Sequence, residues 1–251
     1  MENNESGKAG GSTTFSGQRV VILGGTSGVG LATAEAAAQE GAAVVVASSR
    51  QASVDRAIAR LPKSAEGHLV DLSSEQPIRD FFGRIGAFDH LVFTAGEALR
   101  LGPLESTDTD AARKFFNLCY WGALMAVKYG SPHIRRGGSI TLTTGTAGRR
   151  PEKGWTVAAS ITGAMESLTR ALAVELAPIR VNAVCPGIVR TELWSGIPAA
   201  EREALFEKTG KSLLVGRVGE ASDLAQSYLF LMREGFSTGQ VVVVDGGGAL
   251  V

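Results

Sequence analysis

The sequence contains very little cysteine and no excess of charge of either sign. Only Cys119 and Cys185 occur in 251 residues, without a C-x-x-C pair, so a disulfide framework is excluded and a reducing, cytoplasmic setting is expected. Lysine plus arginine and aspartate plus glutamate both number 25, whereas a nucleic-acid binder usually carries a basic excess. No apolar run reaches the ~18–20 residues of a membrane span, and no secretory signal pattern opens the chain. We therefore expect no nucleic-acid partner, no membrane association and no export.

Histidine is scarce as well. His68, His90 and His133 lie far apart and lack the spacing of metal ligands, so we expect structural roles for them and no bound metal. Hydrophobic residues, in contrast, make up 44% of the chain, which excludes a disordered protein. Glycine is abundant, with 32 residues and no G-X-Y repeat, so many glycines must serve tight turns and close backbone approaches.

The amino-terminal segment differs from the rest of the chain. Residues 1–16 are polar, rich in glycine and serine and without periodicity, and they are predicted to form a disordered tail. No proline-rich linker, internal repeat or break in composition divides residues 17–251. We expect one domain over that range.

Short β-branched runs alternate with helix-length segments from Arg19 onward. The predicted strands are Arg19–Leu23, Ala43–Ala47, Gly67–Val70, His90–Thr94, Ser139–Thr143, Arg180–Val184 and Val241–Val244. The predicted helices lie near 29–40, 51–61, 74–85, 107–130, 157–177 and 220–233. Strands that are almost continuously apolar and separated by helices indicate a parallel sheet covered on both faces. We therefore expect a single-domain α/β fold of Rossmann type, with a doubly wound seven-stranded parallel sheet.

The stretch from Gly187 to Lys211 is the least regular part of the domain. It follows the sixth predicted strand, and ligands of doubly wound sheets bind beyond the carboxyl ends of the strands. We expect this segment to cover a substrate.

A glycine-rich loop joins the first predicted strand to the first predicted helix. Leu23 is followed by Gly24-Gly25-Thr26-Ser27-Gly28-Val29-Gly30 and then by a helix-favouring run from Leu31. Glycines let the backbone approach a pyrophosphate closely, and a helix N-terminus offers free N–H groups and a positive dipole end. The strand, loop and helix order is the context that a dinucleotide-binding motif requires.

With later landmarks, this loop resembles that of the short-chain dehydrogenase/reductase family. The further matches are Asp71-Leu72, Ala95-Gly96, the run Arg180–Gly187 with Thr191, and Val243–Gly247. The resemblance covers the chain from about Phe15 to Val251, and it implies a nicotinamide cofactor. The residues expected to bind it are Gly24, Thr26, Ser27, Gly28, Val29, Gly30, Ser48, Ser49, Arg50, Asp71, Leu72, Ala95, Gly96, Pro186, Gly187, Ile188 and Thr191.

The choice of nucleotide depends on the residues after the second predicted strand. An acidic residue there binds the ribose of NAD, and a basic one receives the phosphate of NADP. The chain has Ser48, Ser49 and Arg50, with no acid and with an arginine suited to bidentate phosphate contacts. This favours NADP(H) over NAD(H); a solvated Arg50 at a helix start is the alternative.

The catalytic residues that the resemblance leads one to expect are absent. The family uses a serine at the end of the fifth strand and a Tyr-x-x-x-Lys on the next helix. Gly145, Ala158 and Thr162 fall at the positions of the serine, tyrosine and lysine. The family also has an asparagine on the preceding helix, and Cys119 falls at its position. Asn117 lies two residues away, so on a helix its side chain would point in another direction.

Other side chains in this region offer replacement chemistry. Pro151-Glu152-Lys153-Gly154-Trp155 resembles a Pro-Asp-Pro-Gly-Trp segment of a divergent branch of the family, which includes fungal NADP(H)-binding reductase/Diels–Alderases and also lacks Tyr-x-x-x-Lys. By this resemblance Glu152 stabilises a cation or relays a proton, and Trp155 stacks on an aromatic substrate or on the cofactor. Thr144 or Thr146 replaces the serine contact. The alternatives are a solvated Glu152, a Trp155 that only packs, and ordinary strand threonines.

A missing acid restricts the reaction that such a site can catalyse. A positioned general acid contributes ~10²–10⁴-fold to a rate. Hydride addition to an iminium gives a neutral amine and develops no alkoxide, so it does not need that acid. The leading hypothesis is an atypical NADP(H)-dependent oxidoreductase that reduces an imine, an iminium or an activated carbonyl of a small molecule.

Two other classes of function stay open. The chain could be a redox-inactive nucleotide-binding protein that acts as a sensor or partner module, or a cyclase or isomerase that retains the cofactor. The predicted helices near 107–130 and 157–177 and the apolar C-terminus resemble the surfaces by which the family assembles. A homodimer or homotetramer is expected.

Overall fold

The computed structural model describes residues 15–97 and 101–251. Its strands are β1 (Arg19–Leu23), β2 (Ala43–Ser48), β3 (Glu66–Leu69), β4 (Phe88–Phe93), β5 (Ile134–Thr143), β6 (Arg180–Pro186), β7 (Val189–Arg190), β8 (Gly219–Glu220) and β9 (Val241–Val244). Its α-helices are α1 (Gly28–Gln39), α2 (Gln51–Ile58), α3 (Glu75–Ile85), α4 (Thr109–Phe116), α5 (Gly122–Gly130), α6 (Thr156–Glu175), α7 (Ala199–Ser212) and α8 (Ala221–Arg233).

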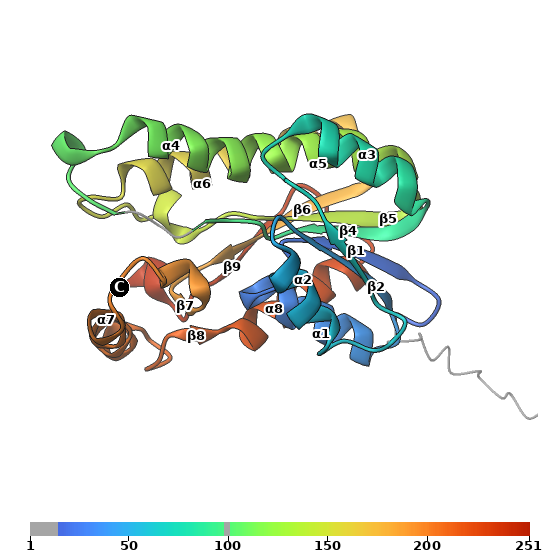
Figure 1. Ribbon diagram of the computed structural model, residues 1–251. Coiled ribbons are helices and arrows are strands. Elements are labelled where there is room, and N and C mark those ends of the chain that lie inside the picture. Colours follow the sequence, from blue (N-terminus) through green and yellow to red (C-terminus); the bar gives the residue numbers. More distant parts are fainter. Residues whose placement is uncertain (1–14, 98–100) are drawn as a thin grey trace, which may run out of the picture.

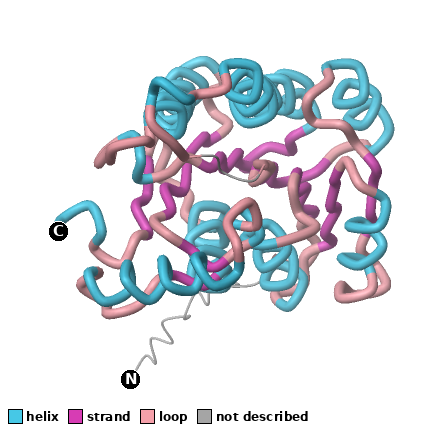
Figure 2. Tube along the Cα trace, turned by 60° about the vertical axis from the view of Figure 1, so that its left-hand side comes forward, coloured by secondary structure: helices cyan, strands magenta, loops and turns pink. Residues whose placement is uncertain are grey.

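Seven strands form one sheet in the order β3-β2-β1-β4-β5-β6-β9, and every pairing in it is parallel. Helices α3, α4, α5 and α6 cover one face, and α1, α2 and α8 cover the other (Figure 1). Figure 2 shows the strands as a middle layer between the two helical layers. This confirms the predicted doubly wound seven-stranded sheet.

Each face of the sheet carries its own apolar core. On one side, strand residues such as Leu91 and Ile140 pack with Phe81 and Phe82 of α3 and with helices α5 and α6. On the other side, Ile22 and Val46 belong to a second buried cluster with α1 and α8. Burial on both faces explains why the central strands are apolar at consecutive positions rather than at alternate ones.

Three segments differ from the sequence prediction. Residues 199–212 are helical (α7), and Phe206 of this helix forms a small separate core with Trp194 and Val218, which periodicity alone did not indicate. The predicted helix over 107–130 is interrupted by a π-helical turn at Asn117–Trp121. β5 begins five residues earlier than expected, at Ile134.

The predicted tail of residues 1–16 is wrong at its end. Residues 1–14 lie outside the described residues. Phe15, however, is 1% exposed, its ring lies edge-on to His90, and its N–H donates to the Glu40 carbonyl. The domain therefore includes Phe15, because its aromatic ring is part of the core. The polar residues around it in the sequence gave no indication of this.

Within the described part of the chain, no helix is long and apolar enough to cross a membrane. The same residues contain no group of three or more histidine, cysteine, aspartate or glutamate side chains arranged to hold a metal ion.

His90 is a buried titratable residue in the sheet. Its Nε2–H donates to Gln18 Oε1 at 2.8 Å, and the Ser139 hydroxyl donates to its Nδ1 at 2.9 Å. Burial lowers the pKa of His90 from 6.5 to about 4, although Asp89 nearby acts in the opposite direction. The imidazole is therefore neutral in the folded protein.

We expect His90 to make the fold sensitive to acid. Above pH 6.5 the imidazole is neutral in both the folded and the unfolded chain, and the folded state has its full stability. As the pH falls from 6.5 to about 4, the unfolded chain binds a proton at His90 and the folded chain does not. This difference removes about 3 kcal/mol from the free energy of unfolding. Denaturant unfolding of the wild type and of His90→Gln at several pH values measures this. The variant should show a shallower loss between pH 6.5 and 4; parallel curves would contradict the assignment.

Candidate functional site

A large cavity lies beyond the carboxyl ends of the parallel strands. Its volume is about 660 Å³. Residues that follow six successive strands line it: Gly24 after β1, Ser49 after β2, Asp71 after β3, Thr94 after β4, Thr144 after β5 and Gly187 after β6. This is the edge at which doubly wound sheets bind their ligands. All seventeen residues predicted to bind the cofactor line this one cavity.

The glycine loop lies against the end of β4. Gly24 has a φ of 85°, and a Cβ placed on it would lie 2.5 Å from the Ala95 nitrogen. A Cβ on Gly30 would collide with the Gly24 carbonyl oxygen and the Thr94 hydroxyl. Thr94 N–H in turn donates to the Leu23 carbonyl at 2.9 Å. Side chains are thus excluded at Gly24 and Gly30 because two backbone segments meet there.

The N-terminus of α1 points its free N–H groups into this loop. Ser27 precedes the helix, but its side chain makes no capping hydrogen bond, and the first turn contains no acidic residue. The first N–H groups of a helix have no partner within the helix, and its dipole is positive at that end. The combination of an uncapped helix start and a glycine loop fits a bound phosphate group.

Ser48, Ser49 and Arg50 form the cavity wall at the end of β2. Ser49 and Arg50 are exposed, and the Arg50 guanidinium makes no hydrogen bond or ion pair with another described residue. The run 48–50 contains no acidic residue. A cation that is held at a helix start and has no protein partner is suited to an anionic ligand.

Asp71 is engaged by its own turn. Its Oδ1 accepts from the Ser73 N–H at 2.9 Å and from the Ser73 hydroxyl at 2.6 Å, and its Oδ2 accepts from the Ser74 hydroxyl at 2.9 Å. The hydrogen bonds from Ser73 hold the pKa of Asp71 below its usual value, with a smaller contribution from Ser74. The residue therefore shapes the loop that borders the cavity and remains an anion there.

Gly145, Ala158 and Thr162 all line the same cavity. Gly145 lies in extended backbone after β5, and a Cβ on it would lie 3.1 Å from the Thr162 methyl group. The Thr162 hydroxyl donates back to the Ala158 carbonyl at 2.9 Å, which occupies its proton. None of these three positions carries a titratable side chain.

The structure separates the three predicted catalytic residues. Trp155 and Thr144 line the cavity, whereas Glu152 is exposed and is not part of its wall. The Thr144 hydroxyl already donates to the Thr162 carbonyl at 2.8 Å and so holds β5 to α6. Of the three, Trp155 has the placement that contact with a bound substrate requires.

Cys119 belongs to the π-helical turn and lines the cavity. Burial raises the pKa of its thiol to about 12, and the Glu97 carboxylate acts in the same direction. The thiol is therefore protonated at neutral pH. Asn117 points away, because its Nδ2–H donates to the Ser73 carbonyl at 2.8 Å.

Sequence reasoning missed much of the apolar wall. The cavity wall includes five apolar side chains that were not predicted: Phe115, Leu118, Ile161, Met165 and Trp194. Two exposed acidic residues, Glu97 and Glu192, also line it. These side chains belong to ordinary helical periodicity or to irregular loops, so no local signal distinguished them from core or solvent positions. Of the segment 187–211, which was predicted to cover a substrate, residues 187–189 and 191–195 line the cavity.

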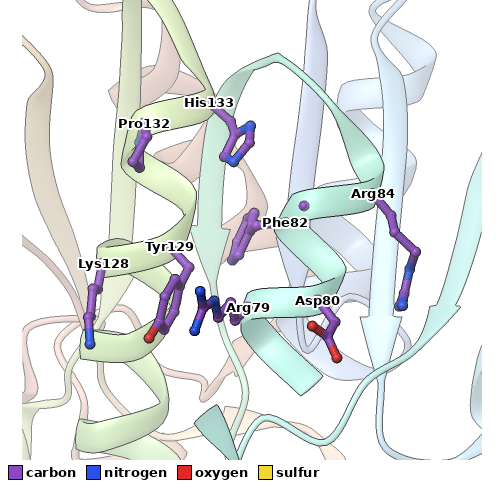
Figure 3. Close-up of a pocket in the computed structure, with 9 residues that line it drawn as sticks. Arg79, Asp80, Phe82, Arg84, Lys128, Tyr129, Pro132 and His133 are labelled. Carbon is purple, nitrogen blue, oxygen red and sulfur yellow. The ribbon is translucent and has the colours of Figure 1, made fainter. Parts of the chain in front are cut away.

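A shallower groove of about 480 Å³ lies between α3 and the end of α5 (Figure 3). It shares no lining residue with the larger cavity. Two of its side chains are already engaged, since Lys128 Nζ and Tyr129 Oη both donate to Glu75 Oε1, at 2.8 and 2.5 Å. Three cationic side chains, Arg79, Arg84 and Lys128, and one acidic side chain, Asp80, line the groove.

Comparison with known proteins agrees with this geometry. A family model described as enoyl-(acyl carrier protein) reductase matches residues 24–248. A short-chain dehydrogenase/reductase of Stachybotrys chlorohalonatus is 38% identical over 252 residues, covering 94% of this chain and 99% of that protein. The chain therefore belongs to the short-chain dehydrogenase/reductase family of oxidoreductases.

Two solved structures are similar over almost their whole length. A small-chain dehydrogenase in complex with NADPH is 40% identical, with a TM-score of 0.84 and coverage of 93% of this chain and 99% of that one. The MalC reductase/Diels-Alderase from Malbranchea aurantiaca is 27% identical, with a TM-score of 0.88 and coverage of 96% and 100%.

We expect Gly30→Ala to damage the loop and Gly83→Ala to be harmless. The new methyl group at position 30 would meet a backbone oxygen, and overpacking of this kind costs about 1–3 kcal/mol, or about 5 °C in Tm. Gly83 lies in α3 with nothing within 4 Å of an added Cβ, so alanine should stabilise that helix slightly. Thermal unfolding and NADPH titration measure both effects. Equal Tm values for the two variants would show that the loop is not closely packed.

Proposed function

We propose that this chain is an NADP(H)-dependent oxidoreductase that transfers a hydride to an imine, an iminium or an activated carbonyl without a tyrosine or lysine acid. The observation that carries the proposal is the contrast within one cavity. At one end are a glycine loop, an uncapped helix start and Arg50, whose guanidinium has no partner among the described residues. At the other end are Gly145, Ala158 and Thr162, which carry no titratable group.

The donor set at the nucleotide end supports NADP(H) as the cofactor. The backbone around Gly28 would hold the pyrophosphate, and Ser48, Ser49 and Arg50 would hold the additional phosphate of the ribose. The similar small-chain dehydrogenase binds NADPH, which agrees with this choice. NAD(H) is less favoured, since the run 48–50 contains no acidic residue and Asp71 of the cavity wall is engaged with Ser73 and Ser74.

The chemistry at the other end follows from what its side chains lack. When bound, the nicotinamide supplies a hydride. Reduction of a ketone also needs a proton at the developing alkoxide, and losing a positioned general acid costs ~10²–10⁴-fold in rate. An iminium carbon that takes up a hydride moves its π electron pair onto nitrogen and ends as a neutral amine, so no donor is required. The apolar wall with Trp155, Phe115 and Leu118 suits a ring-bearing substrate and excludes water.

A second candidate function is cyclisation or isomerisation with retention of the nucleotide. It is supported by the similarity to a protein named both reductase and Diels-Alderase. Such chemistry needs a shaped apolar cavity and no proton donor. A third candidate, a redox-inactive nucleotide-binding module, shares the intact nucleotide end.

Assembly and location belong to the same proposal. Trp121 and Val174 are 52% and 82% exposed on the layer of α5 and α6, and Phe236 is 98% exposed near the edge strand β9. Apolar surface of this kind supports a homodimer or homotetramer. Cys119 and Cys185 are both free thiols, which supports a cytoplasmic setting.

Arg50→Ala should weaken NADPH binding by about 10- to 100-fold, because a charge-assisted contact to phosphate contributes about 1.5–3 kcal/mol. Binding of NADH, which lacks this phosphate, should change little. Arg56→Ala, which removes an exposed arginine of the same helix outside the cavity, is the matched control. Fluorescence titration with both nucleotides measures the effect. An equal loss of affinity for NADH and NADPH would show that Arg50 does not contact the additional phosphate.

The reaction itself is tested with an acceptor panel. We expect NADPH oxidation with cyclic imines such as 3,4-dihydroisoquinoline, and rates at least ~10²-fold lower with unactivated ketones such as acetophenone. Absorbance of NADPH and chromatography of the amine product measure both. Tight NADPH binding without oxidation by any acceptor would favour the redox-inactive module, and a ring-closed product without NADPH loss would favour the cyclase.

A further inference from the structure

Four threonines contribute to the part of the cavity wall that contains Gly145. Thr143, Thr144, Thr146 and Thr162 all line the cavity. A hydroxyl can contact a substrate only if its proton and lone pairs are not already used within the protein. The hydrogen bonds of these four residues therefore decide which of them is available.

Three of the four hydroxyls have committed their proton. Thr143 Oγ1 donates to the Phe93 carbonyl at 2.6 Å and lies 2.7 Å from Tyr228 Oη. Thr144 and Thr162 donate to carbonyl groups of α6, at 2.8 and 2.9 Å. The first of these bonds joins β5 to β4, the second joins β5 to α6 and the third lies within a turn of α6, so all three protons are used inside the protein.

The Thr146 hydroxyl makes no hydrogen bond with any described residue. It is also not among the buried polar atoms that lack a partner, so it is accessible to solvent, and Thr146 belongs to the cavity wall. Its backbone is held in place, because the Thr146 carbonyl accepts from the N–H groups of Arg149 and Arg150 at 2.9 and 2.8 Å, and Ala147 beside it is buried. A fixed backbone with a free hydroxyl is a preorganised binding group.

We propose that Thr146 is the positioning residue that binds the nitrogen of the reacting C=N group, by accepting a hydrogen bond from its N–H. This inference rests on the proposed function and narrows the substrate class to protonated imines that carry an N–H. The nitrogen keeps its proton throughout: the hydride adds to carbon, the π pair becomes the nitrogen lone pair, and a neutral secondary amine results. A neutral hydroxyl accepts this bond without losing a proton of its own.

The test compares two ligands that differ in one hydrogen-bond donor. Protonated 3,4-dihydroisoquinoline carries an N–H, and N-methyl-3,4-dihydroisoquinolinium does not. Thr146→Val keeps the shape and removes the hydroxyl, and Thr146→Ser keeps the hydroxyl. Thr169→Val is the matched control, since Thr169 is buried in α6 with its hydroxyl bonded to Met165 and lies outside the cavity wall. Two quantities are measured: KM and kcat with NADPH, and the dissociation constant from the NADP⁺-loaded protein by calorimetry.

Thr146→Val should raise both KM and the dissociation constant of protonated dihydroisoquinoline by about 10- to 100-fold, the effect of one hydrogen bond from a charged donor, and leave the N-methyl compound within about twofold. Thr146→Ser should restore wild-type values, and Thr169→Val should change neither ligand. Equal weakening of both ligands, or no rescue by serine, would overturn the inference, as would no binding of the protonated imine to the wild type. If the wild type binds both compounds but reduces neither, the proposed reduction fails, while calorimetry still decides on Thr146.

Discussion

The close approach of the glycine loop to the end of β4 is the constraint on which the site depends. Gly24 and Gly30 leave no room for a Cβ, and the Thr94 N–H and hydroxyl both donate to the Leu23 carbonyl. This contact joins β1, α1 and β4 at one point, and it directs the uncapped start of α1 into the cavity. A larger residue would separate the loop from the sheet and displace the helix dipole from its ligand.

The same cavity combines the glycine loop with three positions, Gly145, Ala158 and Thr162, that carry no titratable side chain. Beside Gly145, two of the threonine hydroxyls are structural: Thr144 ties β5 to α6, and Thr162 bonds back within its helix. The protonated Cys119 thiol adds no charge to this wall. The lack of a positioned general acid among these wall residues supports the proposed reduction of a substrate that already carries a positive charge.

Much of the fold follows from local sequence patterns. Helix α7 and Phe15 are exceptions that these patterns did not predict. The valine run of β2 and the loop after β1 are local features, so their prediction was confirmed. Helix α7 was missed because its one buried aromatic, Phe206, packs against Trp194 and Val218 rather than along a continuous apolar stripe. Phe15 was missed because its partners, His90 and Arg233, lie far along the chain.

By itself, the sequence determined the layer architecture, the position of the nucleotide end and the absence of reactive side chains at 145, 158 and 162. These features depend on residue type and on spacing over a few residues, both of which can be read from the sequence. Only the tertiary structure decided which hydroxyl stays free, that Glu152 is outside the cavity wall, and that Asn117 binds the Ser73 carbonyl. Such hydrogen bonds join residues that are distant in sequence, so they exist only once the strands and helices have packed together.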